Sequence, residues 1–392
     1  MLAIGLFSAS WALLHVGFFT HHPVKDTPLY RSYGHQMVDG EVPYRDIRLE
    51  YPPAALPFFA VPAIGDPSQD AYDSRFEWMM LICGGGMIAL MAAALSSVGA
   101  GAARLSAALG FAGVAPLLVG PVILTRFDLW PAALTAGALA LLVAGRNRLG
   151  HAAIGLGFAA KLYPALLLPL ALAYVWKRRG RKEALVCAGV FAAVALAIFL
   201  PFFVLSPPGV LHSIFEQGGR PLQIESLGAS VLIVLHHVFG IGATMSSSHG
   251  SQNLAGSLPN ALAVLQSVLQ AAAIVGIWVW YARGEPGRER LVRAAALAVV
   301  AYIALGKVVS PQYLVWLVPL LPLVRGRRGL AACGLLALAA VLTQTWFPYR
   351  YWAYALHFDT AASWAVLARD LVLVGLLVAL ALPRRLLYGR DP

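Results

Sequence analysis

The sequence has few charged residues for its length. Only 12% of its 392 residues are Asp, Glu, Lys or Arg, whereas 59% are hydrophobic; an average soluble domain is about 25% charged. This balance excludes an ordinary soluble domain. The apolar residues form runs long enough to cross the roughly 30 Å hydrocarbon core of a bilayer, which takes about 20 helical residues. Because backbone polar groups inside lipid must be paired within their own segment, the sequence predicts an all-α integral membrane protein.

Cysteine is also scarce. Cys83, Cys187 and Cys333 each lie alone in an apolar run, which excludes a disulfide framework and a cysteine metal cluster. His236 and His237 are adjacent in a predicted helix, where neighbouring side chains point about 100° apart and do not share a face for a metal ion. We therefore predict no metal site and no cofactor, and leave a requirement for a divalent metal ion open.

Acidic residues are outnumbered, 18 against 29 basic ones, giving a net charge of +11. In a soluble protein this excess would suggest nucleic acid as a partner. Here the basic residues occupy short breaks between apolar runs, so we expect no nucleic acid and assign the breaks to the cytoplasm by the positive-inside rule. The sequence thus predicts a multi-pass protein of a bacterial inner (plasma) membrane with both termini cytoplasmic. The basic breaks are Arg104, Arg146 with Arg148, and residues 177–182, 283–293, 325–328 and 384–390.

Most acidic residues fall in two segments assigned to the outer side, the first extracytoplasmic loop at 21–75 and a second long loop at 206–257. We expect an interfacial helix in each, at 54–61 and at 227–240, with a loop over 245–252. Residues 2–20 lack the basic start and cleavage site of a signal peptide, so we expect a retained first span. The whole chain, 1–392, is predicted to be one polytopic domain of about 12 transmembrane or partly spanning helices.

Two apolar stretches, 149–176 and 293–325, have basic residues at both ends. A single span would place its ends on opposite sides of the membrane, contrary to the positive-inside rule. Each stretch is therefore predicted to be two short helices with a turn between them. The turns place Lys161 and Lys307 at the outer side, where an otherwise costly charge has a use.

Aspartates of the first outer loop are the candidates for general-base chemistry. Asp26 follows the first apolar run closely, where a carboxylate could accept a proton from a hydroxyl of a lipid-anchored acceptor; the structural alternative is an interfacial acid without a partner. Asp46 is the second candidate. It is interleaved with Arg45, Arg48 and Glu50, and mutual pairing is the usual outcome for such charges.

A further group of four basic residues is assigned to the outer side, where Lys and Arg should be depleted. They are Arg126, Lys161, Arg220 and Lys307. A phosphate group on a lipid carrier would explain them through charge-assisted hydrogen bonds. The alternative is pairing with nearby acids, Arg126 with Asp128 and Arg220 with Glu225.

Another charged pair, Arg369 and Asp370, lies inside the last apolar run. We favour a structural role, in which the two charges neutralise each other, over a role of these buried charges in transport.

The order of short motifs resembles the GT-C glycosyltransferases that use polyprenyl-phosphate sugars. It looks most like glycosyltransferase family 87, a group that includes bacterial α-mannosyltransferases. A departure is Thr125-Arg126-Phe127-Asp128, which stands where the family has a glycine- or asparagine-containing turn. The motifs are Asp26-Thr-Pro-Leu-Tyr30, Glu50-Tyr51-Pro52-Pro53, Lys161-Leu-Tyr163-Pro164, Arg220-Pro-Leu-Gln-Ile-Glu225-Ser226 and Lys307-Val-Val-Ser310-Pro311-Gln312-Tyr313.

The resemblance implies a GT-C bundle and an inverting transfer with Asp26 as the base. It also implies a polyprenyl-phosphate-linked sugar donor facing Lys161 and Lys307, with a lipid-linked or glycan acceptor and membrane lipids as further partners. Mannose is the sugar it suggests, and a pentose such as arabinose stays open. The competing class is a transporter or flippase of a lipid-linked sugar, which explains the acid-rich outer loop less well. The expected substrate pocket consists of Tyr30, Tyr51, Tyr163, Glu225, Gln312 and Tyr313.

Overall fold

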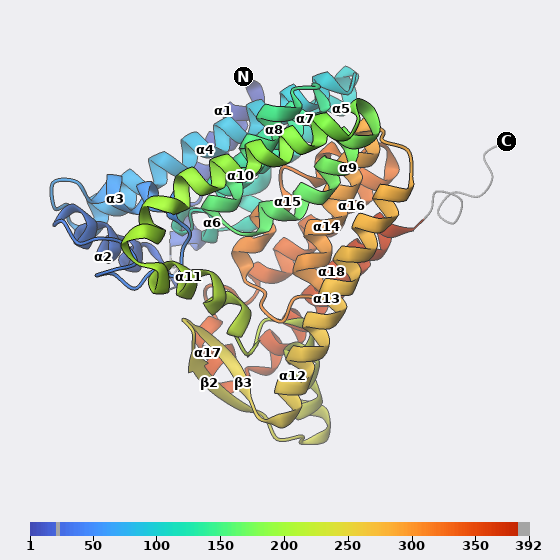
Figure 1. The fold of residues 1–392 in the computed structure, drawn as a ribbon. Helices are drawn as coiled ribbons and strands as arrows, with labels where there is room; N and C mark the ends of the chain where they lie inside the picture. Colours follow the sequence, from blue (N-terminus) through green and yellow to red (C-terminus); the bar gives the residue numbers. More distant parts are fainter. Residues whose placement is uncertain (21–23, 383–392) are drawn as a thin grey trace.

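The computed structural model describes residues 1–20 and 24–382, and these form a mainly helical bundle (Figure 1). Among the described residues, five helices are long and apolar enough to cross a membrane. This supports the predicted helical membrane class, whereas a total of about 12 spans stays a prediction. The basic residues at 384–390 lie outside the described part of the chain. The five helices are α4 (Gln69–Ser97), α5 (Ala102–Val119), α10 (Arg181–Leu205), α13 (Ser257–Arg283) and α18 (Thr360–Ala381).

The first apolar run is shorter as a helix than predicted. Helix α1 covers Leu2–Leu13, and a separate 3-10 turn, η1, covers Gly17–Thr20. Gly17 has a φ of +60°, a backbone conformation that ends a right-handed helix. Twelve residues rise only about 18 Å, so residues 2–20 are not one continuous helix, and their role as a first span stays a prediction.

The bundle is held together by close contacts between helices with small side chains. Helix α7 (Leu129–Val143) packs on α4 and on α8 (Asn147–Ala160), and α8 packs on α10. A Cβ atom at Gly155 of α8 would lie only 2.9 Å from the carbonyl oxygen of Phe191 in α10. Small residues at such positions let helix backbones approach within a membrane. On the other side, α16 (Arg327–Gln344) and α14 (Arg288–Ala304) pack on α18.

Both predicted helix breaks are present, but beyond the second break the 293–325 stretch forms only short helical turns in place of the second predicted helix. Helix α8 ends at Ala160, and Lys161 and the 3-10 segment η3 (Tyr163–Leu167) separate it from α9 (Leu168–Arg179). After α14, an irregular segment leads to η4 (Pro311–Tyr313), α15 (Leu314–Leu317) and η5 (Leu321–Leu323). Pro164 and Pro311 lack the N–H group that a continuous helix needs. The side of the membrane on which these breaks lie stays a prediction.

The first acidic segment is more helical than predicted. The predicted helix at 54–61 is present as η2 (Pro53–Ala55) and α3 (Pro57–Ala63), but α2 (Thr27–Val38) was not predicted. Helix α4 begins at Gln69 rather than near 77, because the Ser68 side chain caps it by accepting a hydrogen bond from the Ala71 N–H at 3.3 Å. Helices α2 and α3 pack on each other and on α4, which fixes this segment against the bundle.

The second acidic segment contains the predicted helix as α12 (Leu227–Phe239), preceded by α11 (Pro207–Gly219). The expected loop over 245–252 was wrong, because β2 (Thr244–Ser248) and β3 (Ser251–Ala255) form a hairpin there. His249 and Gly250 both have positive φ, the conformation that two-residue hairpin turns require. With β1 (Leu222–Gln223) they make a sheet in the order β1-β3-β2, so the protein is not purely helical. Figure 1 shows β2 and β3 beside α12 and α17 (Tyr351–His357) at one end of the bundle.

Candidate active site

A cavity of about 110 Å³ lies where the two helix breaks meet the acidic segments. Its wall brings together six of the residues predicted from sequence, which come from regions far apart in the chain. The other wall residues were not among the predicted site residues; they are Glu50, Pro52, Leu162, Ser213, Tyr302 and Trp316. The six predicted ones are Tyr51, Lys161, Tyr163, Arg220, Gln312 and Tyr313.

Asp26 stands beside this cavity and is paired with a buried arginine. It is the N-cap residue of α2, but its side chain makes no capping hydrogen bond. Instead, its Oδ1 atom lies 2.6 Å from Nη1 of Arg126, and the Tyr30 hydroxyl donates to its Oδ2 at 3.4 Å. Arg126 Nε in turn donates to Oε1 of Gln312 at 3.3 Å. Asp26 is thereby linked to the cavity wall while its side chain remains 28% exposed.

Lys161 is paired with an acid that local sequence did not suggest. Its Nζ lies 2.6 Å from Oδ1 of Asp128, whose side chain is only 1% exposed. The Trp316 indole N–H donates to the same oxygen, and the ammonium group lies 4.7 Å from the centre of the Phe127 ring. Asp128 Oδ2 is buried without a hydrogen-bond partner in the described residues. The predicted alternative pairing of Arg126 with Asp128 is therefore replaced by two separate ion pairs.

The turn between α6 (Val122–Thr125) and α7 creates this arrangement. Arg126 leaves α6 in an extended conformation, with φ −127° and ψ 141°, and Asp128 is the N-cap residue of α7. The two side chains are thus directed to different partners although they are two positions apart. The tetrapeptide 125–128 departs from the family pattern. Through its two ion pairs it connects Asp26, the candidate base, with Lys161, the candidate phosphate-binding residue.

Aromatic rings form much of the cavity wall. Tyr163 stacks on Trp316 at a centroid distance of 4.1 Å, and Tyr313 stacks on it at 4.0 Å. Tyr30 lies 5.6 Å from Tyr51, ring centre to ring centre. Burial raises the pKa of Tyr30 and of Tyr51 well above the usual value for tyrosine, so both hydroxyls remain donors at physiological pH. Such walls offer flat apolar faces and a few hydrogen bonds, as small-molecule sites generally do.

Of the other two predicted cations, Arg220 lines the cavity and Lys307 does not. Arg220 Nη2 lies 3.2 Å from Oε2 of Glu50, also in the wall, rather than pairing with Glu225. Lys307 donates to the carbonyl oxygen of Gly218 at 2.8 Å, at the end of α11. The structure therefore brings Lys161 and Arg220 together at one cavity and leaves Lys307 beside it.

Asp46 lies apart from the cavity on an exposed surface. Its carboxylate pairs with Arg45 at 2.8 Å and accepts the Val42 backbone N–H at 2.9 Å. The hydrogen bond from Arg45, followed by that from Val42, lowers the pKa of Asp46 to about 2. This geometry matches the structural alternative, mutual pairing of interleaved charges.

Glu225 is buried behind the cavity rather than in its wall. Its Oε2 accepts from Nε2 of Gln223 at 2.6 Å, and its backbone oxygen accepts from Nη2 of Arg369 at 2.8 Å. Arg369 also pairs with Asp370 at 2.8 Å, and Asp370 accepts a hydrogen bond from Ser230 of α12. The Arg369–Asp370 pair thus connects α18 to the second acidic segment.

Groups of three or more metal-binding side chains suitably placed for an ion are absent among residues 1–20 and 24–382. His236 and His237 have separate partners, the carbonyl oxygen of Ile241 at 2.6 Å and the hydroxyl of Ser363 at 3.1 Å. Whether catalysis needs a divalent ion stays open.

A comparison with protein families identifies this helical bundle as a GT-C glycosyltransferase. The chain belongs to glycosyltransferase family 87, whose family model matches residues 49–311. The matched region includes Arg126, Lys161, Arg220 and Lys307 but begins after Asp26 and Asp46.

Among solved structures, the chain is similar to ArnT from Cupriavidus metallidurans, crystallised bound to undecaprenyl phosphate. The two chains are 16% identical, with a TM-score of 0.51, over 97% of this chain and 75% of ArnT. At this identity the likeness shows a shared fold. A comparison with curated protein sequences gives no match.

Proposed function

We propose that this glycosyltransferase moves a sugar from a polyprenyl-phosphate carrier to a lipid-linked or cell-envelope acceptor, with inversion at the anomeric carbon. The proposal rests on two ion pairs, one made by each end of the 126–128 turn. Asp26 with Arg126 supplies a positioned base, and Lys161 with Asp128 supplies a cation at the cavity wall.

The proposed reaction is a single displacement. The acceptor hydroxyl oxygen attacks the anomeric carbon while Asp26 takes its proton, and the bond from that carbon to the phosphate oxygen breaks. The bonding electrons leave with polyprenyl phosphate, so its negative charge grows as the bond breaks. Lys161 and Arg220 line the cavity in which that charge would be stabilised. Arg126 orients the Asp26 carboxylate toward the acceptor side.

A polyprenyl-phosphate donor is supported by the fold and by the charges of the cavity. The similar ArnT structure is bound to undecaprenyl phosphate. Two cationic side chains line the cavity here, and each is paired with a carboxylate with which a phosphate would share it. Charge-assisted hydrogen bonds from such groups suit a phosphate. Lys307 would join them by exchanging its contact with the Gly218 carbonyl oxygen for one with the phosphate.

The outer face of the plasma membrane is the proposed working side, because the basic breaks assign the opposite end of the bundle to the cytoplasm. Mannose is the proposed sugar, on the strength of the family resemblance. The alternative of a flippase gains no support from Arg369 and Asp370, since both are engaged with Glu225 and Ser230 in holding helices together.

A transfer assay tests the proposal. Purified protein is incubated with a panel of polyprenyl-phosphate sugars and membrane lipids, and the extracted lipids are analysed by mass spectrometry. We expect one donor, mannose by the proposal, to give a glycosylated product and free polyprenyl phosphate. Asp26→Asn should lower transfer by about 10²- to 10⁴-fold, the usual contribution of a general base. Asp39→Asn, an exposed acid at the end of α2, is the matched control. A fully active Asp26→Asn variant would overturn the mechanism.

A further inference from the structure

The amide group of Gln312, in the wall of the cavity proposed for the donor, has a fixed orientation. Its Oε1 atom accepts two hydrogen bonds, from Nε of Arg126 at 3.3 Å and from the Ser310 hydroxyl at 2.6 Å. The oxygen and nitrogen of an amide can often be exchanged without loss of contacts. Here they cannot, because a guanidinium group has donors and no acceptor, so the atom that faces Arg126 is the oxygen.

The nitrogen of the same amide is left to bind a ligand. It carries two N–H groups, and neither donates a hydrogen bond to any of residues 1–20 and 24–382. Both lone pairs of the oxygen are already used by Arg126 and Ser310. Because Gln312 lines the cavity, its N–H groups are what it can offer there. A ligand satisfies them with an acceptor oxygen.

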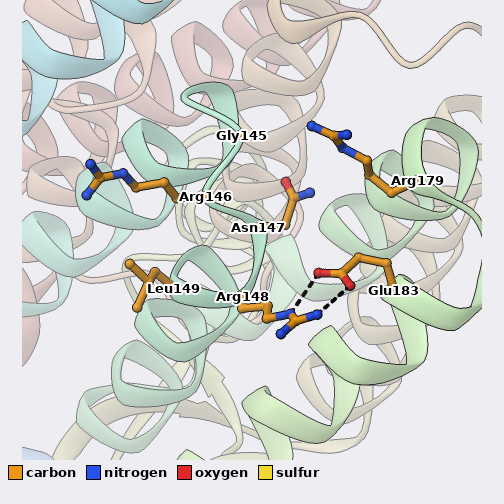
Figure 2. A pocket seen from close by; sticks show the side chains of 7 residues that line it. All are labelled: Gly145, Arg146, Asn147, Arg148, Leu149, Arg179 and Glu183. Carbon is orange, nitrogen blue, oxygen red and sulfur yellow. Dashed lines mark hydrogen bonds and ion pairs between the residues drawn. The ribbon is translucent and has the colours of Figure 1, made fainter.

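Another cavity-lining amide, that of Asn147, differs in both respects. It lines a larger cavity of about 620 Å³ at the turn before α8, which Figure 2 shows together with the Arg148–Glu183 pair. Its Oδ1 atom is buried and accepts no hydrogen bond within the described part of the chain, so its unused group is an acceptor. Helix α8 separates Asn147 from Lys161 by about 20 Å. The larger cavity therefore cannot share a sugar with the proposed reaction site.

The contacts of Gln312 place it on the side of the proposed base. Arg126 bonds to Gln312 through Nε and lies 2.6 Å from Oδ1 of Asp26 through Nη1. In the proposed displacement the anomeric carbon lies between the attacking hydroxyl and the leaving phosphate, so a group next to the base faces the sugar. Lys161 and Arg220 are the cations suited to the phosphate. A neutral amide N–H suits a neutral hydroxyl oxygen.

An aromatic face adjoins this amide in the cavity wall. Tyr313, the next residue, stacks on Trp316 with 4.0 Å between the ring centres, and both rings line the cavity. Binding sites for small molecules commonly combine such apolar faces with a few polar groups that fix the orientation of the ligand. A sugar ring has C–H groups on its faces and hydroxyls around its edge, which matches a flat wall beside a single donor.

We infer that Gln312 determines sugar specificity, by donating a hydrogen bond from Nε2 to one hydroxyl oxygen of the transferred sugar. The inference rests on the proposed function and adds to it the group that recognises the sugar. A sugar that lacks this hydroxyl leaves the amide N–H groups without an acceptor, which costs affinity. Since Oε1 of Gln312 holds Arg126, one side chain contacts both the sugar and the residue that anchors the base.

The affinities of donor analogues test the inference. Polyprenyl-phosphate mannose and its 2-, 3-, 4- and 6-deoxy analogues carry the same phosphate charge, and their dissociation constants for the detergent-purified full chain are measured beside transfer. We expect the wild type to bind one deoxy analogue about 3- to 10-fold more weakly than the mannose donor, the usual effect of one neutral hydrogen bond. Gln312→Met should abolish this difference. Gln312→Asn, a milder change that withdraws the amide by one carbon, should do the same.

Gln36→Met is the matched control. Gln36 donates to the Ser32 carbonyl oxygen within α2 and lies outside the cavity, so this variant should keep the wild-type preference. A preference kept by both Gln312 variants would overturn the inference, and so would a wild type that binds all five donors equally. An unfolded fraction weakens the binding of every donor alike, so the ratio of two affinities within one variant does not depend on its stability.

The same measurements separate this inference from the proposed function. A binding preference that depends on Gln312, without transfer of any sugar, would support the inference and overturn the glycosyl transfer. Normal transfer, with a preference that both Gln312 variants retain, would support the proposed function and overturn the inference.

Discussion

Nη1 of Arg126 lies 2.6 Å from Oδ1 of Asp26, joining the start of α2 to the turn before α7. Arg126 is almost fully buried, with a side chain 6% exposed, whereas that of Asp26 is 28% exposed. The arginine is therefore a fixed anchor and the carboxylate a partly accessible group. This one contact positions the proposed base relative to Gln312 and the cavity proposed for the donor.

Replacing Arg126 with Gln should reduce transfer without abolishing donor binding. The variant removes the anchor of Asp26, and misplacement of a reacting group by about 1 Å can cost about 10²-fold in rate. We expect kcat to fall by about that factor and the KM for the donor to change much less. The measurement is steady-state kinetics in the transfer assay.

Arg45→Gln is the matched control, because it breaks the exposed pair with Asp46 and should leave kcat unchanged. An Arg126→Gln variant with the kcat of Arg45→Gln would show that the ion pair does not position the base.

Replacing Asp128 with Asn should destabilise the protein strongly. Asp128 is buried and holds both Lys161 and the Trp316 indole, and removal of one partner from a buried ion pair costs about 3–5 kcal/mol. We expect a clearly lower melting temperature in detergent. The double variant Asp128→Asn/Lys161→Met should recover part of the loss, because no unpaired charge remains.

Glu183→Gln, which breaks a pair whose Arg148 partner is 61% exposed, serves as the control and should cost at most about 1 kcal/mol. Equal melting temperatures for Asp128→Asn and Glu183→Gln would contradict the importance assigned to the buried pair.

Charge patterning was sufficient to predict the helix breaks around Lys161 and after Ala304. By the positive-inside rule, basic residues at both ends of an apolar stretch place both ends on the same side of the membrane. The stretch must therefore turn back within the membrane, which predicts a break in its helix. The helix at 227–240 was likewise predicted, since its apolar run is long and bounded by Gly240, which has the left-handed conformation that ends α12.

Side-chain partners could not be predicted from local sequence. Reasoning by proximity paired Arg126 with Asp128 and Arg220 with Glu225, whereas the structure pairs them with Asp26 and Glu50. These contacts depend on how distant helices pack, which leaves no local signal. The β2–β3 hairpin was missed for a similar reason, because a polar, serine-rich strand is stabilised by its cross-strand neighbours more than by its own composition.

Gly34→Ala should loosen the segment that carries Asp26. A Cβ atom at Gly34 in α2 would overlap the carbonyl oxygen of Phe59 and crowd the Ala63 side chain in α3. Alanine favours an isolated helix by about 1 kcal/mol over glycine, but a clash with backbone costs about 1–3 kcal/mol. We therefore expect a lower melting temperature and slower transfer. Gly189→Ala in α10, where a Cβ meets nothing within 4 Å, should not destabilise the protein, and equal effects of the two substitutions would refute the packing argument.

Glu225 should make stability depend on pH. Burial raises the pKa of Glu225 to about 8, whereas an unfolded glutamate has a pKa of about 4.3. Between these values the folded protein binds the proton more tightly, so the contribution of Glu225 to stability is greatest below about pH 4 and is lost as pH rises to about 8. Arg369 and Arg126 lower this pKa and Asp370 raises it, but burial is the largest effect.

The test is the melting temperature of wild type and Glu225→Gln measured from pH 5 to pH 9. Glutamine keeps an oxygen that can accept the hydrogen bond from Gln223, and it cannot ionise. The variant should therefore lose less stability than wild type as pH rises. The exposed acid Glu41 provides the control, since Glu41→Gln should follow the wild-type curve. Parallel curves for Glu225→Gln and wild type would mean that Glu225 is not a buried, proton-binding group, because removing its carboxyl would then leave the proton uptake on folding unchanged.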